Sequence, residues 1–366
     1  MPLRLHTAQL GAHRRFGEPK ADAKPRKTPS ILILTPLLVN PASRIIIEPL
    51  EEATSTHARR AGNARKRQTA AGFALALAVS LLSTACGSSG SSASSAAGTG
   101  PPPTSFDACV VVTEDVCAID AIPFASPGGV QLAVDVYKVD GESNRPAVVL
   151  LGPGGWGASS RDTVSGLAIA LAQQGLVVFV GDVRLACTDG GALCGYHYPA
   201  PLADVHSLIQ FATSRGAEYG ARAGPIGVFG LSSGAELALL AAFTEAGASR
   251  PGAVVAWSAP TSFAKLASNP DAGLITRYLG CGYARCPDRW RDASPIAHAS
   301  GAAPPTLLVS SADDPQVPAT QSRSLYRALH SAGATAELDI EPGAAHAQFG
   351  PSTVSRCAEF LLRHLP

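Results

Sequence analysis

The residues of greatest chemical interest are a serine, an aspartate and a histidine that lie far apart in the chain: Ser232, Asp314 and His346. A serine hydroxyl is a poor nucleophile until a base removes its proton. A neutral imidazole can do this near pH 7, and a carboxylate on its other nitrogen fixes the tautomer and stabilises the imidazolium. We therefore predict that Ser232 is a nucleophile, that His346 is its base and then an acid, and that Asp314 orients the imidazole. Asp313 is the alternative orienting residue.

The serine lies in the sequence Gly230-Leu231-Ser232-Ser233-Gly234, between an apolar run over 225–229 and an alanine- and leucine-rich stretch. A G-x-S-x-G sequence between a strand and a helix is typical of a nucleophile elbow, which holds the serine in strained backbone angles and exposes its hydroxyl. The elbow is too sharp for side chains at its flanks. Because a chain with 36 glycines can produce the pattern as an ordinary turn, the downstream residues decide between the two interpretations.

Asp314 and His346 each follow a predicted strand. Asp314 comes after the apolar run 304–310, and His346 lies on a glycine-containing turn after 335–340. The chain order serine, acid, histidine differs from the orders of the two well-known serine-protease folds. Because functional groups of open α/β sheets gather at the carboxyl ends of the strands, we expect all three side chains to meet at one edge of a sheet.

A fourth component would stabilise the negative oxygen that forms when the serine attacks. The buried run 147–151 breaks into the glycine-rich segment 152–157, whose backbone amides could converge on that oxygen. Since Pro153 has no N–H to donate, Gly154 and Gly155 are the predicted donors. The amide of Ser233, directly after the nucleophile, would supply another. The alternative interpretation is an ordinary glycine loop at the end of a strand.

A sheet and its covering helices must position these residues. Strand-length apolar runs alternate with helical patterns, which predicts an α/β fold with a mostly parallel eight-stranded sheet and helices on both faces. The predicted strands are 119–124, 130–138, 146–151, 176–181, 225–229, 253–257, 304–310 and 335–340. The predicted helices are 161–174, 201–217, 233–246, 319–332 and 351–364. Within a catalytic domain of residues 105–366, the segment 258–303 lacks strong periodicity and is predicted to be an insertion over the site.

From about Ala121 to its end, the chain resembles the α/β-hydrolase superfamily, and most closely the hormone-sensitive-lipase-like and feruloyl-esterase-like branch. The motifs that carry the resemblance are Gly152 to Trp156, Asp182-Val183-Arg184-Leu185, the segment 198–205, Ala293-Ser294-Pro295-Ile296 and Ser311-x-x-Asp314-x-x-Val317-Pro318. The resemblance implies the α/β-hydrolase fold and places Ser232, Asp314 and His346 at the catalytic triad of the family. It also implies hydrolysis of a small-molecule carboxylic ester through an acyl-enzyme, without a cofactor.

The sequence departs from that family at two places. Gly152 and Pro153 replace a histidine and a glycine of the oxyanion loop, and the elbow reads Leu-Ser-Ser where Asp-Ser-Ala is common. Two alternative functions therefore stay open. One is an amidase or peptidase on the same fold, and the other is a non-catalytic surface lipoprotein that serves as a binding module. The presence of all three triad residues argues against the binding module, and the altered loop argues for it.

Composition and residue spacing exclude other classes of function. A net charge of +1 with 16% charged residues provides no basic field for nucleic acid. We expect no metal site, because the sequence has no Cys-x-x-Cys and its histidines are scattered. The histidines predicted to be structural or exposed are His206, His298, His330 and His364.

The N-terminal third has a different character. A basic cluster before the apolar stretch 70–85 predicts a lipoprotein signal peptide over 64–86 that ends at a lipidated Cys86. An uncleaved anchor is the alternative, although the apolar stretch is short for a membrane span. Residues 87–104 predict a flexible tether of glycine, serine and proline. Residues 1–63 are predicted to be no part of the mature protein, with translation starting downstream. The expected product is extracytoplasmic, and it is held at a membrane by its lipid or secreted.

Seven cysteines follow Cys86, and six of them are near neighbours in pairs. Close pairs form local disulfides in an oxidising compartment. We therefore predict the disulfides Cys109–Cys117, Cys187–Cys194 and Cys281–Cys286. The remaining Cys357 lies on an apolar run near the C-terminus, where we expect a free buried thiol.

Overall fold

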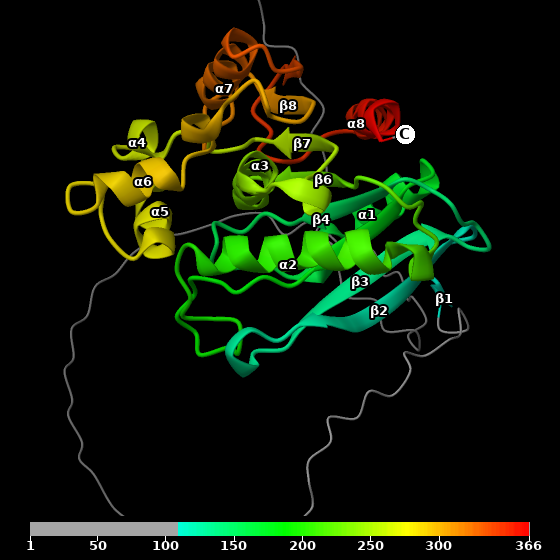
Figure 1. Ribbon diagram of the computed structural model, residues 1–366. Helices are drawn as coiled ribbons and strands as arrows, with labels where there is room; N and C mark the ends of the chain where they lie inside the picture. Colours follow the sequence, from blue (N-terminus) through cyan, green and yellow to red (C-terminus); the bar gives the residue numbers. More distant parts are fainter. Residues whose placement is uncertain (1–108, 366) are drawn as a thin grey trace, which may run out of the picture. The chain divides into compact units, whose positions relative to one another are not determined.

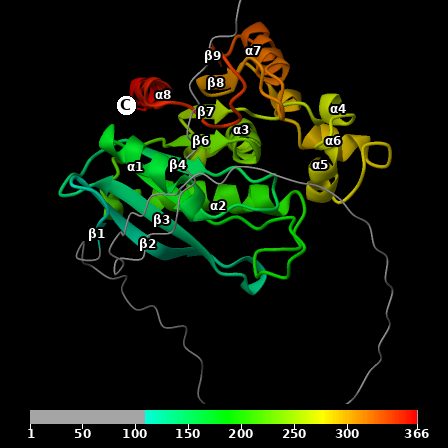
Figure 2. The same ribbon diagram turned by 180° about the vertical axis from the view of Figure 1, so that it is seen from behind.

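The computed structural model describes residues 109–365. The predicted signal peptide with Cys86, the tether and the segment 1–63 lie outside these residues. The described part contains a nine-stranded sheet with the strand order β1-β2-β3-β5-β4-β6-β7-β8-β9, drawn from two sides in Figure 1 and Figure 2. This confirms an α/β fold with one large sheet.

The sheet is mostly parallel. Strands β4 to β9 run parallel to one another, whereas the pairs β1–β2, β2–β3 and β3–β5 are antiparallel. The bounds are β1 (Val110–Val111), β2 (Val116–Ala125), β3 (Leu132–Val139), β4 (Ala147–Leu151), β5 (Val177–Gly181), β6 (Gly227–Leu231), β7 (Ala253–Trp257), β8 (Thr306–Ser311) and β9 (Ala336–Glu341). The central strands β4, β6, β7 and β8 are buried along their whole length, which explains their continuous apolar runs.

The sheet has nine strands in the described residues, where the sequence predicts eight. All eight predicted strands are present, and the additional one is β1, whose two exposed valines pair with β2 beside the Cys109–Cys117 disulfide. A two-residue strand has no detectable alternation of its own. Its pairing with β2 defines it, and a local sequence pattern cannot predict that pairing.

Helices cover both faces of the sheet, as the sequence predicts. On one face α2 (Ala200–Arg215), α3 (Ser233–Thr244) and α7 (Thr320–Ser331) pack against the sheet in one apolar core. On the other face α1 (Ser165–Gln173) and α8 (Pro351–His364) contribute to a second core. The predicted first helix begins as a 3₁₀ turn over Arg161–Val164, and a second 3₁₀ turn, Gly216–Tyr219, follows α2.

The segment 258–303 is more regular than its lack of periodicity suggests. It contains α4 (Phe263–Leu266), α5 (Ala272–Leu279), α6 (Pro287–Asp292) and a 3₁₀ turn over Pro295–His298, which Figure 1 shows grouped to one side of the sheet. The four-residue α4 and the six-residue α6 are too short to display a clear period. They are stabilised mainly by tertiary packing, because the rings of Phe263, Tyr278 and Trp290 are buried together.

The structure contains the three predicted disulfides, Cys109–Cys117, Cys187–Cys194 and Cys281–Cys286. Cys357 is free and buried, and it accepts a hydrogen bond from the indole of Trp257 over 3.2 Å. Burial raises the pKa of the Cys357 thiol to about 12, although this hydrogen bond opposes the shift. The thiol is therefore protonated and unreactive, and its role is to fill space in the core. No helix within residues 109–365 combines the length and apolar character needed to cross a membrane.

Candidate active site

The structure brings the three predicted side chains into contact. His346 places Nε2 2.8 Å from the hydroxyl oxygen of Ser232, and its Nδ1 lies 2.9 Å and 3.0 Å from the two carboxylate oxygens of Asp314. The contacts assign the tautomer: Nδ1–H donates to the carboxylate, so Nε2 is left to accept the serine proton. Ser232 follows β6, Asp314 follows β8 and His346 follows β9, so all three lie at the carboxyl ends of parallel strands.

The serine occupies a sharp turn between β6 and α3. Its backbone has φ 53° and ψ −116°, an unfavourable region for a residue with a side chain. The flanking glycines are required by close backbone contacts. A β-carbon on Gly230 would lie 2.2 Å from the carbonyl oxygen of Gly234, and one on Gly234 would lie 2.4 Å from that of Leu151. The turn has the steric character expected of a nucleophile elbow.

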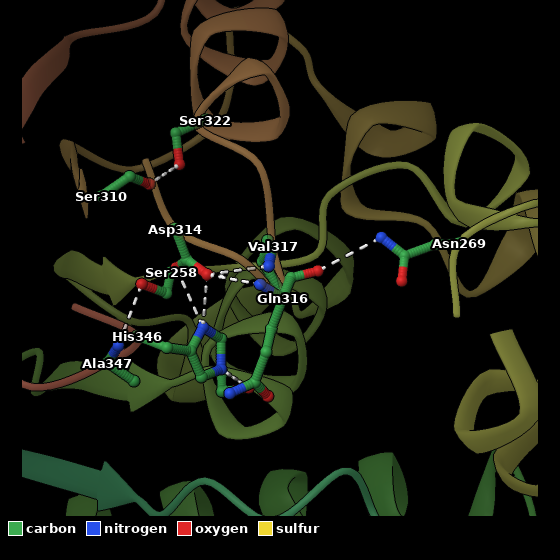
Figure 3. A network of polar contacts seen from close by, with 10 residues as sticks. Ser258, Asn269, Ser310, Asp314, Gln316, Val317, Ser322, His346 and Ala347 are labelled. Carbon is green, nitrogen blue, oxygen red and sulfur yellow. Dashed lines mark hydrogen bonds and ion pairs between the residues drawn. The ribbon is translucent and has the colours of Figure 1, made fainter. Parts of the chain in front are cut away.

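The Asp314 carboxylate is held by several donors, as Figure 3 shows. Its Oδ1 accepts hydrogen bonds from the amides of Gln316 and Val317, each at 2.9 Å. Burial acts to raise the pKa of Asp314, but the hydrogen bonds from His346 and from these amides outweigh it, and the pKa lies below its ordinary value. The neighbouring Asp313 is exposed, and its amide donates to Gly343. The contact of His346 is thus with Asp314.

Ser258 is a positioning residue that the sequence reasoning missed. It is fully buried and has φ 49°. Its hydroxyl accepts a hydrogen bond from the amide of Ala347 at 3.1 Å and makes another with Asp314, so it joins the loop of the acid to the loop of His346 (Figure 3). The sequence did contain a signal for this residue, because Ser258 directly follows the predicted strand 253–257 and so lies at the same sheet edge as the triad.

The glycine-rich loop after β4 has an unusual backbone. Gly154, Gly155 and Trp156 have φ values of 142°, 59° and 58°. A β-carbon on Gly154 would lie 1.7 Å from the carbonyl oxygen of Ala158. Within residues 109–365, none of the amides of Gly154, Gly155 and Ser233 donates a hydrogen bond. The amides of all three predicted oxyanion donors are therefore unpaired in the described part of the chain.

A cavity of about 370 Å³ opens at the serine and histidine. Gly154 and Gly155 line it, while Ser233 does not. Its wall is mostly apolar, and the segment 258–303 contributes Leu266, Leu274 and Ile275. The Asn269 side chain also donates to the carbonyl of Gln316 over 3.4 Å, which connects this segment to the loop of Asp314 (Figure 3). Trp156 lines the cavity, whereas Trp257 packs in the core against Phe229 and Phe349.

The other predicted residues lie away from this cavity. The histidines outside its lining include His206, His298, His330 and His364, and of these His206 contacts Glu245 while His298 contacts the carbonyl of Asp292. One group in the described part of the chain has the spacing of metal ligands, Cys187, Asp189 and Cys194. Its two sulfurs are bonded to each other, so it offers no thiolate to a metal ion.

The chain is similar in sequence to known proteins. The BD-FAE family model matches residues 134–329. Esterase LipC of Mycobacterium tuberculosis is 29% identical over 238 residues, which cover 58% of this chain and 56% of the relative. Esterase LipQ of the same organism is 30% identical over 164 residues, which cover 41% of this chain and 39% of the relative. The chain thus spans about half the length, or less, of these curated relatives.

Solved structures with the same architecture are also similar. A truncated carbohydrate esterase from gut microbiota superposes with a TM-score of 0.60 at 21% identity, covering 71% of this chain and 98% of that one. Esterase 2 of Thermogutta terrifontis with propionate bound superposes with a TM-score of 0.55 at 23% identity, covering 66% of this chain and 92% of that one. These likenesses identify the fold as that of the α/β-hydrolases.

Proposed function

The chain belongs to the BD-FAE family of α/β-hydrolases, and we propose on this basis that it is a serine hydrolase that cleaves carboxylic esters of small molecules. The observation that carries the proposal is the 2.8 Å contact between Ser232 Oγ and His346 Nε2, two residues that line a mostly apolar cavity. The esterases among its relatives support the choice of ester over amide.

The geometry supports a two-step reaction. In the first step His346 takes the proton of Ser232 while the serine oxygen bonds to the acyl carbon, and the amides of Gly154, Gly155 and Ser233 stabilise the oxyanion. The C–O bond to the alcohol then breaks, and His346 protonates the departing oxygen. In the second step the same imidazole removes a proton from water, whose oxygen bonds to the acyl carbon. The bond from that carbon to Ser232 Oγ then breaks, and His346 returns the proton to the serine oxygen as the acid is released. Asp314 stabilises the imidazolium in both steps.

The cavity favours a small ester. A volume of about 370 Å³ is near the lower end of the range for ligand pockets, roughly 300–1,000 Å³. The apolar side chains on its wall suit a short acyl chain and would leave polar groups of a large substrate unpaired. We propose that acyl chains of a few carbons are preferred, in keeping with the propionate bound to the Thermogutta esterase.

A series of p-nitrophenyl esters tests this function. We expect kcat/KM to be highest for short acyl chains and to fall once the chain exceeds the cavity, because the surplus methylenes would remain in water. Initial rates from acetate to dodecanoate measure this, with a peptide anilide as the amide control. Cleavage of the anilide without cleavage of any ester would identify an amidase, and cleavage of neither would favour a binding module.

We also propose that the enzyme is exported and anchored by a lipid on Cys86. Six of the seven cysteines in the described residues are disulfide-bonded in near pairs, which supports an oxidising compartment. In a bacterial host fed a radiolabelled fatty acid, we expect the wild type to carry label in the membrane fraction and the Cys86→Ala variant to carry none. Equal labelling of both would contradict the anchor.

A further inference from the structure

Glu236 is a wholly buried carboxyl group one helical turn after the nucleophile. It lies on α3 among apolar side chains and is 0% exposed. Its Oε2 accepts a hydrogen bond from the indole N–H of Trp156 at 2.8 Å, and no cation pairs with it in the described part of the chain. An isolated buried charge is highly unfavourable. The environment therefore suits the neutral acid.

The pKa of Glu236 agrees with this assignment. Burial raises it well above the ordinary value, although hydrogen bonds with Trp156 and Tyr278 oppose the shift. A neutral carboxyl can accept from the indole with one oxygen and donate to the Tyr278 hydroxyl with the other. Oε1 and that hydroxyl are both buried, and neither makes a hydrogen bond of ordinary geometry within residues 109–365, so no other contact competes for this pair.

Trp156 is strained and held from several sides. Its φ of 58° is rare for a residue with a large side chain, and such strain persists only where the surroundings maintain it. Its ring stacks on Tyr278 with centroids 4.7 Å apart and meets the edge of Phe263 at 5.4 Å. Its carbonyl accepts a hydrogen bond from Ala186 at 2.7 Å. The bond to Glu236 is the contact that ties this ring to α3.

We propose that Glu236 is a positioning residue which, through Trp156, fixes the amides of Gly154 and Gly155 relative to Ser232. The two glycines directly precede Trp156, and α3 begins at Ser233, so one hydrogen bond links both parts of the oxyanion site. Without it, the strained loop would relax and its amides would leave the oxygen that develops in the transition state. This inference rests on the proposed esterase activity.

The test compares kcat and KM of Glu236→Leu, Glu236→Gln and Trp156→Phe on p-nitrophenyl acetate. We expect Glu236→Leu to lower kcat by about 10–100-fold, somewhat less than the loss of a whole oxyanion donor, with little change in KM. Glu236→Gln keeps an acceptor of the same shape and should restore most of kcat. Trp156→Phe should lower kcat as much as Glu236→Leu does. The double variant with both changes should be no slower than either single variant, because each change removes the same hydrogen bond.

Leu240→Ala is the matched control, since Leu240 is a buried α3 residue that does not line the active-site cavity. It should lower the unfolding temperature and leave kcat unchanged. A folded Glu236→Leu variant with wild-type kcat, or a Glu236→Gln variant as slow as Glu236→Leu, would overturn the positioning role while the esterase proposal stands. If Glu236→Leu does not fold, Trp156→Phe decides alone. A wild type that cleaves no ester would overturn both.

Discussion

Replacing Ser232 with alanine is expected to lower kcat for ester hydrolysis by about 10⁶-fold, the scale seen when a serine hydrolase loses its nucleophile. The physical reason is that the covalent route disappears entirely. His346 keeps its bond to Asp314, but it faces no hydroxyl within 2.8 Å from which to take a proton. Initial rates with p-nitrophenyl acetate measure the effect, and thermal unfolding of each protein verifies that the variant is folded.

Ser207→Ala is a suitable control for this comparison. Ser207 lies on α2, outside the cavity, and its hydroxyl bonds only the backbone of its own helix. We expect this variant to keep the wild-type rate. A Ser232→Ala variant that kept more than about one hundredth of the wild-type kcat would show that another group attacks the ester.

The second large effect concerns the two adjacent aspartates. Asp314→Asn should lower kcat by about 10⁴-fold, because an amide at this position favours the wrong imidazole tautomer. Asp313→Asn is the matched control, since Asp313 is exposed and its side chain does not contact His346. It should be as active as the wild type. The same assay measures both variants, and the opposite ranking would assign the orienting role to Asp313.

The fold was predictable where local pattern and burial coincide. The strands β4, β6, β7 and β8 are buried on both sides, so their apolar runs specify them without tertiary information. The short helices α4 and α6 of the 258–303 segment have four and six residues and are stabilised by the aromatic rings they bury. Packing of that kind joins residues distant in sequence, and no periodicity reveals it.

The reactive residues of the site were predictable from the sequence, whereas the residues that hold them in place were less so. Ser232, Asp314 and His346 have reactive side chains that follow strands, and the elbow glycines mark a turn that only glycine permits. Ser258 and Glu236 support the reactive groups and are wholly buried, and their signals in the sequence were weaker. The single carboxylate in the apolar helix after the elbow was the signal for Glu236. Its partner Trp156 is 80 residues away.

The central claim is that the hydroxyl of Ser232 is an activated nucleophile. Peptide mapping by mass spectrometry after reaction with a fluorophosphonate tests it most directly, because the probe bonds only to such a serine. The account predicts one phosphonylated peptide, which contains Ser232, and no adduct in the Ser232→Ala variant. An unmodified Ser232 in the wild type, or an adduct that persists in the variant, would contradict it.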